Sequence, residues 1–114
     1  MVESLGDAET AIWLNQKGYD MRLAERPHNR VILCYTAANL GYYYSAANQP
    51  AVALEWLDKA RDWWGDLPNF PLNIVANKAR CFVQLGAFEK AKALLDSLIN
   101  EMQDVSRVNW ANLS

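Results

Sequence analysis

The sequence predicts an all-α protein of about five helices, and three observations support that fold class. Residues that favour helices, chiefly Ala, Leu, Glu, Lys and Gln, fill stretches of about 15 to 20 residues. The four prolines and three of the five glycines fall between those stretches or at their first residue. No stretch alternates apolar and polar residues for long enough to indicate a β-strand.

Breaks in the sequence bound the first three expected helices. Gly6-Asp7 opens the first helix, 7–26, and Pro27-His28-Asn29 closes it. The second helix, 30–47, runs from that turn to the break at Asn48-Gln49-Pro50. The third helix, 50–64, places its apolar residues on one arc when successive side chains lie about 100° apart; they are Pro50, Ala53, Leu57, Ala60 and Trp64.

Two further helices are expected after the loop from Gly65 to Pro71. The fourth helix, 71–85, ends at the turn Leu85-Gly86-Ala87, and the fifth covers 88–102. The fifth is amphipathic and is expected to bury one arc against a neighbour, formed by Phe88, Ala91, Leu95, Leu98 and Met102. Residues 106–114 are expected to be a tail or the start of a further helix.

Composition and charge exclude several classes of protein. The chain has 114 residues, 52% of them hydrophobic, which suits one domain (1–114) and is too apolar for a disordered chain. Its 11 Lys and Arg are scattered among 13 Asp and Glu, a net charge of −2, so no nucleic-acid partner is expected. The longest apolar run, 31–35, is far shorter than the ~20 residues of a membrane span. With no visible secretion signal, the two cysteines predict reduced thiols in a cytoplasmic protein.

The residues that usually carry catalysis are too few and too scattered to predict an enzyme. His28 is the single histidine and lies in a loop. Cys34 and Cys81 lie on different expected helices without a histidine neighbour, so neither a zinc site nor a cysteine nucleophile is indicated. No glycine-rich phosphate loop occurs. We therefore expect no catalytic residue, no metal and no cofactor.

The helices come in two similar pairs. Ala37-x-x-Leu40-Gly41-x-x-Tyr44 is followed by Ala53-x-x-x-Leu57-x-x-Ala60, and Val75-x-x-Lys78-Ala79-x-x-Phe82 by Ala91-x-x-x-Leu95-x-x-Leu98. This pattern resembles the tetratricopeptide repeat (TPR) family, in which small residues mark the contact between the two helices of a hairpin. The resemblance implies an α-solenoid of antiparallel hairpins, with a half repeat at 7–26 and repeats at 30–67 and 71–105.

The chain departs from the usual family pattern in three respects. Lys78 replaces the expected Leu, neither repeat has the first Trp, and Asn15 stands where a large apolar residue is usual. Ala11, Ala53 and Ala91 are 42 and 38 residues apart, against a usual repeat of about 34. The longer spacing resembles repeats of bacterial transcriptional and signalling regulators. The chain could thus be part of a longer array or regulator.

The resemblance implies a concave groove lined by the first helix of each pair. The outward arcs of those helices hold Tyr35, Asn39, Tyr42, Asn73, Asn77, Arg80 and Gln84. An Asn amide can pair with a peptide backbone, and Arg80 could pair with a carboxylate, so these residues are the candidate binding site for a peptide or protein segment. The alternative is that the same arc is only a solvated face.

A second hypothesis is a structural role, in which the chain associates with itself as a homodimer. Trp64 lies on the buried arc of its helix, and Trp56 and Trp63 lie at the edge of that arc. We expect the following helical pair to cover these two rings. The alternative is an exposed interaction patch in which Trp63 and the tail take part.

Overall fold

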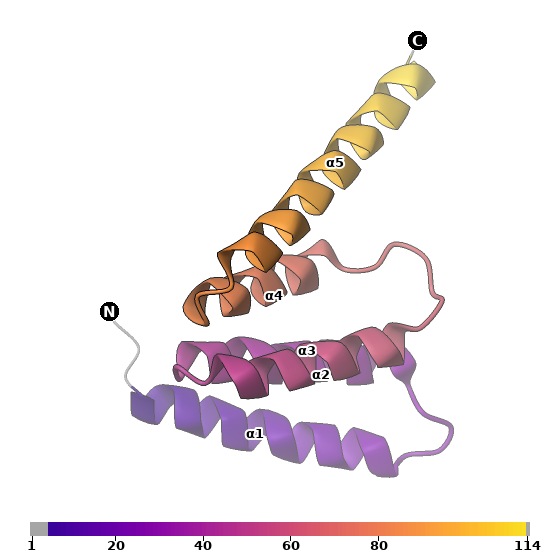
Figure 1. Ribbon diagram of the computed structural model, residues 1–114. Coiled ribbons are helices and arrows are strands. Elements are labelled where there is room, and N and C mark those ends of the chain that lie inside the picture. The colour runs from indigo at the N-terminus through magenta and orange to yellow at the C-terminus, as the bar shows by residue number, and fades with distance from the viewer. Residues whose placement is uncertain (1–4, 114) are drawn as a thin grey trace.

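The computed structural model describes the backbone of residues 5–113 and the side chains of residues 6–103. The described chain contains five helices and no strand, which confirms the all-α fold class (Figure 1). The helices are α1 (Leu5–Ala24), α2 (Arg30–Ala46), α3 (Pro50–Trp64), α4 (Leu72–Gln84) and α5 (Phe88–Leu113).

Each helix packs against the next one along the chain, and α2 also contacts α4. Figure 1 shows α1 on one side of the α2–α3 pair and α4 on the other, with α5 rising away from α4 at an angle. The connections are short, so neighbouring helices run in opposite directions as antiparallel hairpins. The molecule measures 49 × 39 × 27 Å along its principal axes.

The α2–α3 hairpin is the best-packed part of the described structure. Leu33, Leu40 and Leu57 are fully buried between its helices. A Cβ atom on Gly41 would lie 2.7 Å from the Leu57 side chain and 3.2 Å from the carbonyl oxygen of Ala53. Glycine at this position therefore lets the two helices approach closely, as the repeat pattern predicts.

Polar groups at the start of α2 fix the open end of that hairpin. The Asn29 side-chain oxygen accepts a hydrogen bond from the Ile32 amide at 3.1 Å, which caps α2. The Arg30 guanidinium donates to the carbonyl oxygens of Trp63 at 3.2 Å and Trp64 at 2.8 Å. These carbonyls are at the end of α3, where the helix itself offers no partner. Arg30 thus joins the first turn of α2 to the last turn of α3.

Aromatic side chains attach α1 to α3. The Tyr19 ring packs edge-on against Trp56 with centroids 5.0 Å apart, and its hydroxyl accepts a hydrogen bond from the Trp63 indole nitrogen at 2.9 Å. Both tryptophans are half-buried against the core. The expectation that they lie at the edge of the core is confirmed, but α1 covers them rather than the following helical pair. Trp63 is therefore not part of an exposed interaction patch.

The C-terminal part of the chain differs from the expectation. Residues 106–113 continue α5 instead of forming a separate tail or helix, because no glycine or proline interrupts the sequence from Phe88 to Leu113. The expected buried arc of this helix is also mostly open: Ala91 is buried, whereas Phe88 is 65% and Met102 57% exposed. The reason is that α4 alone packs against α5 among the described helices.

Candidate functional site

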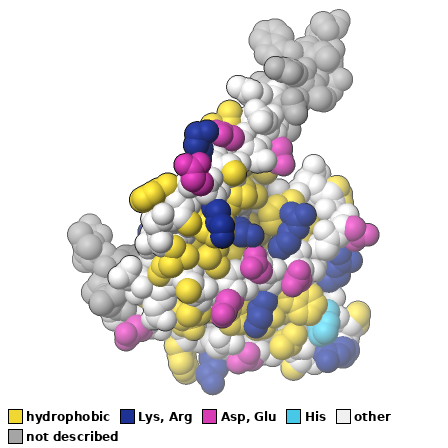
Figure 2. All heavy atoms as spheres, in the orientation of Figure 1, with side chains coloured by type: hydrophobic (Ala, Val, Ile, Leu, Met, Phe, Trp, Pro, Cys, Tyr) yellow, Lys and Arg dark blue, Asp and Glu magenta, His cyan; other side chains and the backbone are white. Residues whose placement is uncertain are grey.

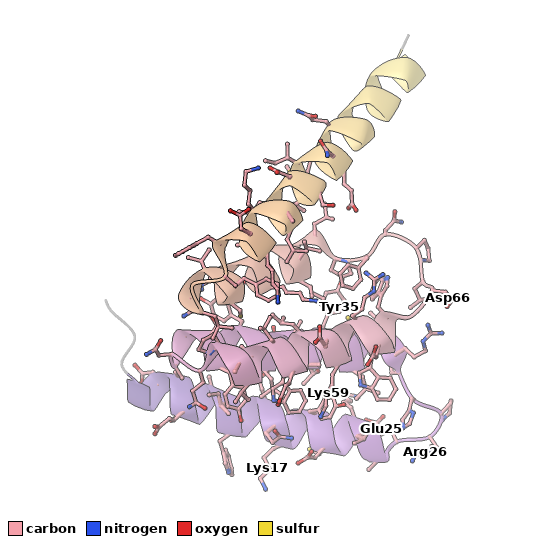
Figure 3. All side chains as sticks on the ribbon, in the orientation of Figure 1. Lys17, Glu25, Arg26, Tyr35, Lys59 and Asp66 are labelled. Atoms are coloured by element: carbon pink, nitrogen blue, oxygen red, sulfur yellow. The ribbon has the colours of Figure 1, made fainter. Side chains whose placement is uncertain are left out.

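The seven residues predicted to line a groove lie on α2 and α4, the first helices of the two pairs. One of them, Asn77, is half-buried. The others are exposed, as their arc predicts; they are Tyr35, Asn39, Tyr42, Asn73, Arg80 and Gln84. Figure 3 labels Tyr35 on the side of the α2–α3 pair that faces α4.

Two contacts join α2 to α4 on this surface. The Ser45 hydroxyl donates to the Gln84 side-chain oxygen at 2.5 Å, and the Gln84 side-chain nitrogen donates to the Ser45 carbonyl at 3.0 Å. The Arg80 guanidinium lies 5.6 Å from the centre of the Tyr42 ring, within the range of a cation–π interaction. These contacts bring the last turns of α2 and α4 together.

The pairing with Ser45 changes the role expected for Gln84. Both polar atoms of its side-chain amide are used by Ser45, which is itself buried. Gln84 therefore holds α2 and α4 together, and its second N–H and the second lone pair of its oxygen are what it has left to offer a ligand. The sequence carries no signal for this role, because Ser45 and Gln84 are 39 residues apart and meet only through tertiary packing.

The remaining polar groups of the surface are open. Within the described part of the chain, no side-chain hydrogen bond engages the amides of Asn39, Asn73 and Asn77 or the hydroxyls of Tyr35 and Tyr42. The Tyr35 ring is nevertheless held in place, edge-on to Trp64 with centroids 6.1 Å apart. The surface thus offers amides that can both donate and accept, beside aromatic rings fixed by packing.

Arg80 supplies the only charge among these seven residues. It forms no ion pair with the described side chains. Its guanidinium is oriented by Tyr42 and keeps its N–H groups available to a carboxylate. One free cation among neutral polar groups suits a ligand with few charges better than a strongly acidic one.

The two thiols lie beneath this surface and are unsuited to chemistry. Cys34 on α2 and Cys81 on α4 are both fully buried. Burial raises the pKa of each thiol above its ordinary value; at Cys81 a hydrogen bond with Ser45 and the charge of Arg80 oppose this effect but do not cancel it. Because the thiolate is the nucleophile, a raised pKa makes both groups unreactive.

These thiols predict how stability depends on pH. A buried thiol keeps its proton at pH values where the thiol of the unfolded chain has lost it, so the unfolded state is favoured as the pH rises above the ordinary thiol pKa of 9.0. We therefore expect the free energy of unfolding to fall between about pH 8 and pH 10 in urea titrations. The double variant Cys34→Ala, Cys81→Ala should show a shallower fall, and an equally steep one would contradict this explanation.

The structure also contains a cavity that the sequence analysis did not single out, on the other side of α4. Asn73, Asn77 and Arg80 share one arc of α4. Val75 and Lys78 are about 130° or more around the helix axis from the middle of that arc, so they face the other side. The cavity is lined by residues of α3, α4 and α5 and by Phe70 of the loop before α4. In the sequence, Arg61 and Lys78 stand next to apolar positions of their helices. That pattern is consistent with a cavity that has charged groups at its edge, but it does not predict one.

Comparisons with known proteins found no matching family model, no similar curated protein and no similar solved structure. Within the described residues, no helix combines the length and apolar character needed to cross a membrane. Over the same residues, His, Cys, Asp and Glu side chains form no group of three that could hold a metal ion.

Proposed function

We propose that the protein is a non-enzymatic interaction module that binds a peptide or protein segment on the surface formed by α2 and α4. The observation that carries this proposal is the set of open hydrogen-bonding groups on that surface, next to the unpaired guanidinium of Arg80. An extended peptide presents alternating amide donors and acceptors, which the side chains of Asn39 and Asn77 can match.

The repeat spacing supports a TPR-like arrangement. The contacts Tyr42–Arg80 and Ser45–Gln84 join residues 38 and 39 positions apart, close to the 38 residues that separate the repeated alanines Ala53 and Ala91. The small residues of the pattern are also buried at helix contacts; they are Ala37, Gly41, Ala53, Ala79 and Ala91. By analogy with the long repeats of bacterial regulators, we place the module in a larger regulatory protein.

The binding proposal is tested on the groove residues themselves. A partner captured from a lysate is first reduced to its minimal peptide, which is then titrated by calorimetry against the triple variant Asn39→Ala, Asn77→Ala, Arg80→Ala. Loss of two amide contacts and one charged contact is expected to weaken binding at least about tenfold. Lys17→Ala is the control, because Lys17 lies on the side of α1 away from the other helices (Figure 3). Unchanged affinity in the triple variant would rule out this surface.

The second candidate function, self-association, is favoured by apolar side chains exposed on the first and last helices. On α1, Trp13 is 59%, Leu14 57% and Met21 71% exposed. On α5, Phe88 and Met102 are exposed to a similar degree. A homodimer that covers these side chains predicts twice the chain mass in light scattering and a return to monomer in a Met21→Ser, Phe88→Ser variant. A monomeric mass at tens of micromolar would argue against this role.

A further inference from the structure

A half-open cavity of about 170 Å³ lies between α3, α4 and α5. Its apolar walls come from all three helices and from the loop before α4: Leu57, Phe70, Ile74, Val75 and Leu94. Three charged side chains, Asp58, Arg61 and Lys78, complete the lining. Figure 2 shows dark blue Lys and Arg side chains beside yellow apolar surface where α5 rises from the helices below it.

The size of the cavity indicates what it can hold. Pockets for cofactors and small-molecule ligands usually enclose about 300 to 1,000 Å³, and this cavity of about 170 Å³ is smaller. Its volume suits a single apolar side chain inserted from another molecule. Because its walls are mostly apolar, such a side chain gains by leaving water.

The charges at the cavity are unevenly paired. Lys78 forms an ion pair with Asp58, with 3.1 Å between the amine nitrogen and the carboxylate oxygen. Arg61 forms no ion pair with any described side chain; its guanidinium lies over the Phe70 ring, 4.6 Å from the ring centre. Glu101 borders an adjoining open hollow with Arg61 but lies beyond ion-pair distance from it. Among the described side chains, Arg61 is therefore the charged group of the cavity lining that has no ion-pair partner.

We propose that this cavity is a second docking site, which takes one apolar side chain of a protein partner while an adjacent acidic residue of that partner pairs with Arg61. The guanidinium lies over the ring of Phe70 and forms no described ion pair, so its N–H groups can meet a carboxylate in the forked geometry that arginine favours. The site is on the opposite side of α4 from Asn73, Asn77 and Arg80, and it does not depend on the proposed groove.

The experiment uses a minimal probe of the stated chemistry, the blocked dipeptide N-acetyl-leucyl-glutamate amide, at millimolar concentration. Methyl NMR signals of Ile74, Val75 and Leu94 are expected to shift on titration. Replacing glutamate by glutamine in the probe, or Arg61 by glutamine in the protein, should weaken binding about threefold to tenfold. Arg61→Lys keeps the charge and should retain most of the affinity. Arg22→Gln, on α1 and outside the cavity lining, is the matched control.

Several results would overturn the proposal. One is that the methyl signals stay unmoved on titration, and another is that the glutamate and glutamine probes bind with equal affinity. The third such result is an equal loss of affinity in Arg22→Gln and Arg61→Gln. Hexanoate supplies an apolar chain and a carboxylate without a peptide, and tighter binding of hexanoate than of the dipeptide would overturn the assignment to a protein partner. Shifts confined to residues of the α2–α4 surface would support binding in the groove and overturn docking at the cavity. The experiment therefore distinguishes failure of one proposal from failure of the other.

Discussion

Replacing Gly41 by alanine is expected to lower the free energy of unfolding by about 2 kcal/mol. The added methyl group would lie 2.7 Å from two carbon atoms of the Leu57 side chain, and Leu57 is only 1% exposed. One of these atoms is Cγ, the branch point of the side chain, and the Ala53 carbonyl oxygen would also lie only 3.2 Å away, so relieving the contact requires α2 and α3 to shift apart. This cost outweighs the gain of about 1 kcal/mol that alanine brings to a helix interior.

The matched control is Gly18→Ala on α1. A Cβ atom there would meet nothing within 4 Å, so only the helix preference acts and stability should rise by about 0.5 to 1 kcal/mol. Urea unfolding followed by circular dichroism measures both variants. Effects of the same sign in the two variants would show that helix preference, rather than the approach of α2 and α3, decides the outcome.

Leu57→Ala is expected to lower the free energy of unfolding by about 3 kcal/mol. Its side chain is buried between α2 and α3 and also forms part of the cavity wall, so its removal loses apolar burial and leaves empty space. Leu14→Ala on α1 provides the comparison, because Leu14 is 57% exposed and should change stability by less than about 1 kcal/mol. The same urea titration measures both, and similar losses at the two positions would contradict the packing described for α2 and α3.

The two core substitutions should also depend on each other. The atoms that would collide with a methyl group at position 41 are Cγ and Cδ2 of Leu57, which Leu57→Ala removes. In the double variant with Gly41→Ala, the combined loss of stability should therefore be smaller than the sum of the two single losses. Additive losses would mean that the collision is relieved elsewhere in the structure.

The sequence predicts the helices well because each depends on local signals. Gly65 and Pro71 bound the loop between α3 and α4, and the spacing of Ala53, Leu57 and Ala60 identifies the buried side of α3. The end of α5 was predicted less well, since residues 99–113 contain neither glycine nor proline and nothing local fixes where the helix stops.

The sequence predicts less of the candidate sites because they depend on how helices meet. The outward arcs of α2 and α4 follow from helical periodicity, and the exposure of Asn39 and Arg80 agrees with it. The pair between Ser45 and Gln84 and the cavity beside Arg61 require the relative positions of separate helices. Periodicity along one helix contains no information about such positions.

The hydrogen bonds from Arg30 have a consequence for the order in which the molecule loosens. They tie the beginning of α2 to the end of α3, so this hairpin is closed at both ends, whereas α5 rests on α4 alone among the described helices. Local opening should therefore begin with α5 and leave the closed hairpin intact. Since Leu94 of α5 is one wall of the cavity, a side chain seated there would restrain α5, and docking would be coupled to ordering of the last helix.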